Sequence, residues 1–219
     1  MSLDIQTLER TALCVAACDG IDTADLKAGS VSIIDMSTRS VTATAGLNGV
    51  AQSGSYIRQA SSTGMDFEPE YITTNAAGTK AYVTLQEANA IGVLDLQSNS
   101  FSQVIGLGAK NFAAPGNSID PSHKDGKIQL RSANVVGLYQ PDSIAAYEAK
   151  GKTYLVMANE GDTREDDGDK ARVKDKASLS GAPSDLGQLN VSTTDSTSCT
   201  KLVTFGGRSF SIRDDNGNL

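Results

Sequence analysis

Tryptophan is missing from this sequence of 219 residues, and aromatic residues make up only 5% of it, so a core must rely on aliphatic side chains. There is a single histidine, His123, which is too few for a binuclear phosphatase centre with several histidine ligands. No segment is long and apolar enough to cross a membrane, and no signal peptide is recognisable. These absences argue against a binuclear phosphatase and against a membrane-spanning segment in this chain.

Basic residues are also scarce, since 19 of them face 26 acidic residues and give a formal net charge of -7. An acidic chain lacks the basic footprint that nucleic-acid binding requires, so nucleic acid is not an expected partner. The same charge is compatible with cation binding, although solubility alone explains it equally well.

The three cysteines, Cys14, Cys18 and Cys199, leave at least one thiol unpaired within the chain. A disulfide between Cys18 and Cys199 is one arrangement in an oxidising compartment, and three free thiols are the other. Three cysteines without a suitably placed histidine make a poor zinc site.

The most regular stretch runs from Glu68 to Ile105 and predicts four short strands at 71–74, 80–85, 90–96 and 101–105. The turn sequences NAAG at 75–78 and QSNS at 97–100 separate them, and β-branched and aromatic residues dominate between the turns. Four adjacent antiparallel strands of this size are typical of one blade of a β-propeller.

Two further units repeat this pattern, one before the stretch from Glu68 to Ile105 and one after it, so that this stretch is the second of three units. The first unit has strand-like segments at 11–17, 29–36 and 41–45, but no clear opening strand precedes Thr11. The third unit has them at 141–147 and 151–158, and strand character resumes at 202–205 and 208–213. Asp35 and Asp95 end equivalent strands, which indicates a repeated structural role for both.

The sequence therefore predicts a partial β-propeller over residues 1–219. Its blade units span approximately 8–45, 68–105 and 141–219. Long connectors at 46–67 and 106–140 join them, and a polar insertion at 166–200 interrupts the third unit. The insertion is expected either to form a short helix near 170–177 or to be disordered.

Three units do not close a ring, because propellers use about four to eight blades. The fold class is predicted as all-β, with about three blades of a larger ring in this chain, and the chain is expected to be a piece of a longer protein. The expected partners are other blades or domains of that protein, or a second copy pairing through open sheet edges. Without the remaining blades, the three units would also expose apolar faces built from Val15, Val31, Ile33, Val83, Val93, Leu155 and Ile212.

Several motifs occur in order along the chain: GSVSIID at 29–35, EPEYI at 68–72, AYVTLQEANAI at 81–91, APGN at 114–117, YQPDSIAAYEAKGKTYLVMANEGDTRE at 139–165 and FGGRSFSIRDDNGNL at 205–219. Together they resemble the choice-of-anchor I family, with blades of the YVTN type, over nearly the whole chain. The resemblance implies a secreted or cell-surface propeller, like the mesenchyme-specific cell-surface glycoproteins, with an extracellular, cell-surface or periplasmic location. Some bacterial members are labelled alkaline phosphatase-like.

The acidic loop at 159–169 is the strongest candidate site. Glu160 and Asp162, together with Asp19 of the equivalent loop in the first unit, offer the carboxylate oxygens that Ca²⁺ prefers. Both loops should leave the same edge of their blades, so they are expected to converge on one face. The alternative, which weighs more, is a solvated acidic loop with Asp162 capping a turn.

Two other sets of residues have both a chemical and a structural interpretation. Glu68, Glu70 and Asp142 flank the prolines that start two units, where paired carboxylates either perform acid–base work or fix the stacking of neighbouring blades. The structural interpretation is favoured. His123 lies in a polar loop, and no GxSxG motif accompanies it, so a catalytic role is not expected.

The leading hypothesis for function is a secreted or cell-surface propeller domain with a binding or scaffold role and no catalytic constellation. The alternative is a Ca²⁺-dependent hydrolase of the phosphatase, phytase or lactonase type that uses the acidic loops. Convergence of Asp19, Glu160 and Asp162 beside a pocket would favour the enzyme.

Overall fold

The computed structural model describes residues 5–8, 11–16, 29–58, 67–164 and 168–219, with backbone alone for the first two ranges. Strands joined by turns make up nearly all of the regular structure, and the helical turns in these ranges are three short 3₁₀ turns. The fold is therefore all-β, as predicted. Its strands form several sheets, and none of them closes on itself within the described part of the chain.

Three larger sheets form the body of the molecule. The first sheet has the order β1-β2-β3-β4, with β1 (Ile5–Leu8), β2 (Thr11–Ala16), β3 (Ser30–Asp35) and β4 (Ser40–Gly46). The second has the order β5-β9-β8-β7-β6, with β5 (Gln52–Ser55), β6 (Pro69–Thr74), β7 (Lys80–Leu85), β8 (Ala90–Asp95) and β9 (Ser100–Leu107). The third has the order β12-β13-β17, with β12 (Pro141–Ala149), β13 (Lys152–Asn159) and β17 (Ser209–Asp214).

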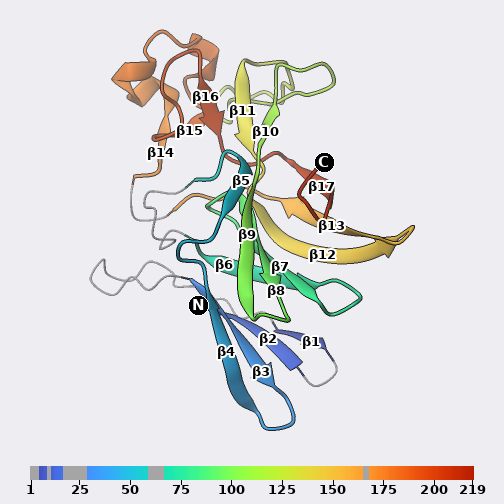
Figure 1. Cartoon of the computed structure of the whole chain (residues 1–219). Coiled ribbons are helices and arrows are strands. Elements are labelled where there is room, and N and C mark those ends of the chain that lie inside the picture. Colours follow the sequence, from blue (N-terminus) through green and yellow to red (C-terminus); the bar gives the residue numbers. More distant parts are fainter. Residues whose placement is uncertain (1–4, 9–10, 17–28, 59–66, 165–167) are drawn as a thin grey trace.

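The three larger sheets stack face to face, with the second in the middle (Figure 1). One apolar cluster joins the first and second sheets and includes Val31, Ile33, Ile72 and Val83. Another joins the second and third sheets and consists of Tyr82, Ile91, Val93, Ile105, Leu107, Ile144, Leu155 and Met157. Stacked sheets of this kind bury both faces of the middle one, which explains why β7 and β8 are almost wholly buried.

A smaller region lies at one end of this stack (Figure 1). It contains the sheet β10-β11-β16, with β10 (Ala109–Asn111), β11 (Val135–Leu138) and β16 (Leu202–Thr204). It also contains the pair β14 (Lys170–Arg172) and β15 (Asn190–Ser192), and the 3₁₀ turns Val173–Asp175, Ala177–Leu179 and Ser184–Leu186. A separate apolar cluster holds this end together and includes Phe112, Val135, Val191 and Leu202.

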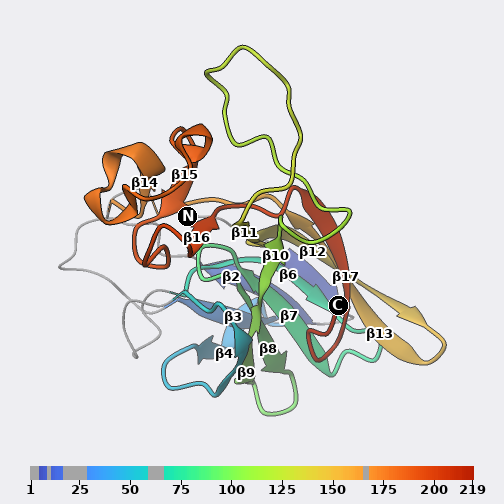
Figure 2. The ribbon, with the colours of Figure 1, turned by 90° about the horizontal axis from the view of Figure 1, so that it is seen from above.

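The segment between β10 and β11 projects from this end as a long loop, yellow-green in Figure 2. Its base is fixed by an isolated bridge between Ile119 and Arg131, and Ile119 is buried. Ile128 lies further along the loop and is 96% exposed. The loop is therefore anchored at its base, and its outer part is presented to solvent.

The same bulges and capped turns recur in successive sheets. β6 and β12 both begin at a proline and carry a bulge between that proline and an isoleucine three residues later. Asp35 and Asp95 each accept hydrogen bonds from backbone N–H groups of the turn that follows, and the shortest is 2.7 Å for Asp35 and 2.8 Å for Asp95. Both aspartates therefore fix a hairpin turn, in agreement with the structural role predicted for them.

Several expectations about the elements were wrong. A strand, β1, does precede Thr11 and pairs with β2, so the first sheet has four strands. The strand expected at 202–205 is present as β16, but it pairs in parallel with β11 and not with the strands of the third sheet. The insertion contains β14, β15 and the 3₁₀ turns in place of one short helix or a disordered segment, because Val173, Leu179 and Leu186 bury their side chains in its own apolar cluster.

The expected exposure of apolar side chains is confirmed for Ile212 and is wrong for the five residues that lie between sheets. Val31, Ile33, Val83, Val93 and Leu155 are at most 5% exposed, because each lies between stacked sheets. Ile212 is 44% exposed, and Phe210 beside it on β17 is 71% exposed. Apolar side chains therefore face solvent on the outer face of the third sheet. The side chain of Val15 lies outside the described residues.

Candidate functional site: a cationic pocket

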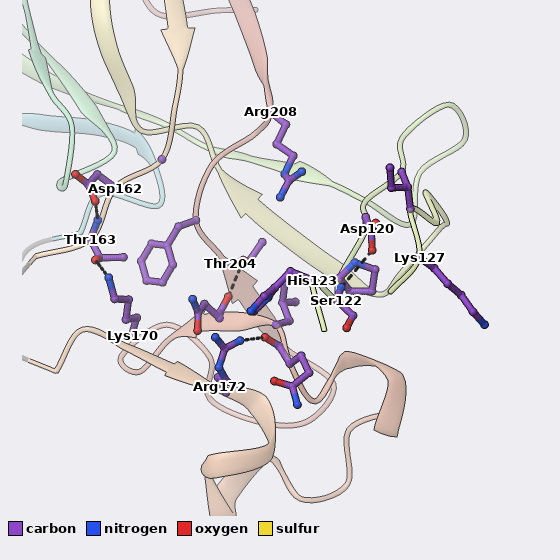
Figure 3. A pocket seen from close by; sticks show the side chains of 17 residues that line it. Asp120, Ser122, His123, Lys127, Asp162, Thr163, Lys170, Arg172, Thr204 and Arg208 are labelled. Carbon is purple, nitrogen blue, oxygen red and sulfur yellow. Dashed lines mark hydrogen bonds between the residues drawn. The ribbon is translucent and has the colours of Figure 1, made fainter. Parts of the chain in front are cut away.

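An open pocket of about 530 Å³ lies at the end of the stack that carries the smaller sheets. Its walls come from four parts of the chain: the long loop at 120–128, residues 161–163 together with Lys170 and Arg172, residues 188–190, and residues 204–208. Figure 3 shows the side chains that line it. A volume of this size is within the range of small-molecule sites.

One wall depends on a close approach of two glycines. Gly161 and Gly206 both have positive φ angles, +89° and +80°, which favour glycine. A Cβ on Gly161 would lie 2.1 Å from the backbone nitrogen of Gly206, so no larger residue fits there without movement. Gln140 holds the same wall, because its Nε2 donates to the carbonyl oxygen of Asp162 at 2.6 Å.

A buried arginine lies beneath the pocket. The side chain of Arg58 is 2% exposed and pairs with Asp169, which is 1% exposed, and its Nε donates to Asp195 Oδ2 at 2.8 Å. Burial alone would lower the pKa of Arg58, but the hydrogen bonds from its guanidinium to both carboxylates raise it above its ordinary value. Its guanidinium also lies over the ring of Phe205, at 5.3 Å from the ring centroid.

This arginine joins distant parts of the chain. It follows β5, whereas Asp169 and Asp195 flank the pair β14 and β15, and Phe205 lines the pocket itself. The ion pairs therefore hold the insertion against the second sheet, and the position of the pocket wall depends on them.

Four cationic side chains line the pocket: Lys127, Lys170, Arg172 and Arg208. Figure 3 shows Arg172 and Arg208 reaching toward the middle of the pocket from opposite sides, whereas Lys127 points outward at its rim. Lys170 Nζ donates to the hydroxyl of Thr163 at 3.0 Å, and Arg172 Nη1 donates to the carbonyl oxygen of Gln188. Both of these partners are neutral.

The two carboxylates of the pocket already accept backbone hydrogen bonds. Asp120 accepts from the N–H groups of Gln129 at 3.1 Å and Ser122 at 3.3 Å. Asp162 accepts from the N–H of Thr163 at 2.7 Å. These bonds stabilise turns in the pocket walls, which is the capping role considered for Asp162.

His123 and Ser122 also line the pocket, but they do not form a catalytic arrangement. Ser122 Oγ accepts from the N–H of Lys124 at 3.3 Å. Within the described ranges no hydrogen bond joins the His123 imidazole to Ser122 or Asp120, and His123 is exposed. The relay from carboxylate to imidazole to hydroxyl that a serine nucleophile needs is not formed by these three residues.

The comparison with family models decides where this chain belongs, because the model of the choice-of-anchor I domain matches residues 17–219. The chain belongs to the choice-of-anchor I domain family. Membership suggests a surface-associated, non-catalytic domain, since choice-of-anchor domains occur in surface or secreted proteins. No curated protein sequence matches the chain significantly.

The metal site predicted for this choice-of-anchor I domain is described only in part. Glu160 is exposed and accepts a hydrogen bond from Gln86 Nε2 at 3.2 Å, and Asp162 is exposed at the pocket wall. Asp19 lies outside the described residues. Where the structure describes the chain, no group of three or more histidine, cysteine or acidic residues is placed to hold a metal ion. Calcium binding by these residues remains a prediction.

The carboxylates that flank the prolines of the choice-of-anchor I domain lie close enough to influence one another. Burial raises the pKa of Glu70 to about 8, and repulsion from Glu87, Asp142, Glu68 and Asp162 adds to this effect. Burial also raises the pKa of Asp142, with a contribution from Glu160. Burial and the neighbouring carboxylates therefore favour the protonated form of Glu70, which lessens the repulsion at this junction between the second and third sheets.

The remaining expectations concern the cysteines and the membrane. Cys199 has a free thiol and lines a second, smaller hollow, whereas Cys18 and the side chain of Cys14 lie outside the described residues. In the part of the chain that is described, no helix has the length and apolar character needed to cross a membrane.

The cationic residues of the pocket were missed by reasoning from the sequence of this choice-of-anchor I domain. Lys170 and Arg172 lie in the polar insertion, and Arg208 lies 36 residues beyond Arg172 in the sequence. Alternation along β14 does give a signal, because Lys170 and Arg172 are separated by one residue and so point to the same face of the strand. Arg208 has no comparable local signal.

Proposed function

We propose that this choice-of-anchor I domain is a non-catalytic binding domain that takes a small ligand, or the end group of a larger one, in the cationic pocket. The observation that carries the proposal is the pocket itself, about 530 Å³ in volume and lined by side chains from four separate segments. Such a site offers a few polar groups that fix the orientation of a ligand, together with the apolar surface of Phe205 and Leu189.

We further propose that the three stacked sheets are neighbouring blades of a β-propeller. The support is the repeated packing: the same bulge after a proline and the same aspartate-capped turns recur as one sheet follows the next. On the outer face of the third sheet, Tyr147, Phe210 and Ile212 are 42%, 71% and 44% exposed. A further antiparallel sheet is the expected occupant of this face, because the first and second sheets bury their equivalent faces in that way.

The binding role is expected to be exerted outside the cell or at its surface. Choice-of-anchor domains occur in surface or secreted proteins, and the negative net charge of -7 agrees with a domain that meets ligands other than nucleic acid. The chain would then act as one module of a larger assembly of blades.

A ligand screen tests the binding role. Wild-type protein would be melted with a panel of sugars, nucleotides, amino acids and small organic acids, and compared with Asn190→Trp, which fills the pocket from an exposed position on β15. Asn48→Trp, at an exposed turn after β4, is the matched control. We expect ligands that raise the melting temperature of wild type and Asn48→Trp but not of Asn190→Trp. A panel without such a ligand would count against the proposal.

The alternative of a Ca²⁺-dependent hydrolase is tested by turnover. Phosphate monoesters, phytate and lactones would be offered at millimolar Ca²⁺, with Glu160→Gln/Asp162→Asn as the variant that removes the predicted metal ligands. Our proposal expects no turnover above the blank. Hydrolysis that needs Ca²⁺ and is lost in the double variant would overturn the non-catalytic interpretation.

A further inference from the structure

The charge of the pocket is opposite to that of the whole chain. The formal net charge of the protein is -7, yet among the described residues four cationic side chains line the pocket and two carboxylates accompany them. Water would solvate these cationic side chains equally well anywhere on the surface. Their gathering from three separate segments into one pocket therefore indicates a site for negative charge.

None of the four cations has a carboxylate partner among the described residues. The side chains of Lys170 and Arg172 bond to the neutral oxygens of Thr163 and Gln188, and those of Lys127 and Arg208 have no hydrogen-bond or ion-pair partner in the same ranges. Elsewhere the chain does pair its cations, as in the bridges from Arg58 to Asp169 and from Arg131 to Asp185. The carboxylates Asp120 and Asp162 face backbone N–H groups instead.

We propose that the pocket binds an oxyanion group, a carboxylate, sulfate or phosphate, carried by a small polar molecule. This inference rests on the proposed binding function and names its ligand class. Arg172 and Arg208 approach the middle of the pocket from opposite sides, and their planar guanidinium groups match the geometry of an oxyanion (Figure 3). Lys170 adds a third positive charge on β14.

The size of the pocket argues for more than a bare anion. Its volume of about 530 Å³ far exceeds that of an inorganic anion, and Asn190, Thr204 and Phe205 line the remaining space. Amide and hydroxyl groups beside an aromatic ring suit a polar body with hydroxyl groups, so the oxyanion would be one end of the ligand.

A matched set of hexoses tests the charge requirement directly. Glucose, glucuronate, glucose 6-phosphate and glucose 6-sulfate share one ring and differ in the group at carbon six. Isothermal titration at low ionic strength would compare them, with inorganic phosphate and sulfate as bare oxyanions. We expect each charged hexose to bind at least roughly tenfold more tightly than glucose, since a charge-assisted hydrogen bond is worth more than a neutral one.

Two arginine variants decide whether the pocket is responsible. Arg208→Gln removes an exposed pocket charge, and its φ of 46° is close to the 43° that Gln140 adopts in the same fold. Arg39→Gln is the control, because Arg39 is also exposed and has a φ of 56°, but lies in the turn between β3 and β4. We expect Arg208→Gln to weaken binding of the charged hexoses about tenfold and Arg39→Gln to leave it unchanged.

The possible outcomes separate this inference from the proposed function. Glucose binding as tightly as the charged hexoses, with loss in Asn190→Trp, would overturn the oxyanion inference and leave the binding function in place. Failure of every charged hexose and of both bare oxyanions would also overturn the inference. Equal weakening by Arg208→Gln and Arg39→Gln would place the anion outside the pocket and refute the assignment.

Discussion

Replacing Arg58 by methionine should destabilise the protein strongly, because its guanidinium is 2% exposed and pairs with a carboxylate that is 1% exposed. Methionine keeps much of the apolar volume but leaves the Asp169 charge buried without its arginine. Removing one partner of a buried ion pair typically costs about 3–5 kcal/mol. For a chain of this length 1 kcal/mol corresponds to roughly 2–4 °C, so the melting temperature should fall by about 6–12 °C at the lower cost.

Two further variants make this test specific to the buried pair. Arg131→Met breaks the bridge to Asp185, whose side chains are 29% and 57% exposed, and should cost less than about 1 kcal/mol. The double variant Arg58→Met/Asp169→Leu replaces the buried charges by apolar groups and should recover much of the loss. Thermal melts of the four proteins check the reasoning. A fall for Arg58→Met no larger than for Arg131→Met, or no recovery in the double variant, would refute it.

Three other perturbations probe the junction, the outer face and the pocket wall. Glu70 has its pKa raised from 4.5 to about 8, so the folded state holds its proton more tightly and loses stability as the pH rises from about 4.5 to 8. The melting temperature of Glu70→Gln, relative to that of wild type, should therefore rise as the pH is raised from 5 to 9. A difference that stays constant with pH would contradict this. Wild type should self-associate at high concentration through the exposed apolar side chains of β17, as measured by light scattering, and Phe210→Thr/Ile212→Thr should abolish this association. A wild type that stays monomeric at high concentration would show that this face needs no covering partner. Gly161→Ala places a Cβ 2.1 Å from Gly206 at a φ of +89° and should lower stability by about 1–3 kcal/mol, measured by urea unfolding. An unchanged midpoint would mean that the wall relaxes freely.

The middle sheet was predictable because its information is local. The turns NAAG and QSNS lie between runs of β-branched residues, and β7 has the predicted bounds while β6, β8 and β9 differ from the prediction by one or two residues at their ends. The aspartate at the end of β8 caps its own turn within three residues, so it too can be read from neighbouring positions.

The errors lie where distant contacts decide the structure. β1 is four residues long and its sequence, IQTL, is half polar, so only its pairing with β2 identifies it. β16 pairs with β11 in parallel across more than sixty residues of sequence, which alternation of side chains does not reveal.

The candidate site illustrates the same limit. The crowding of acidic residues in one loop predicts a metal site at Glu160 and Asp162. In the structure, Glu160 accepts a hydrogen bond from Gln86, and Asp162 accepts one from the backbone N–H of Thr163. The pocket draws its charges from the insertion and from Arg208, which the fold brings together through β16 and the Gly161–Gly206 approach. Sequence patterns report the charge of a loop, but not which other segment faces it.

The separate apolar cluster at the pocket end has an evolutionary consequence. Phe112, Val191 and Leu202 pack with one another and do not share the clusters that hold the stacked sheets. Substitutions in the lining of the pocket can therefore accumulate without disturbing the register or packing of the stack, so long as Arg58 keeps the two parts joined. If the pocket binds a ligand as proposed, its specificity can change while the stacked sheets stay the same.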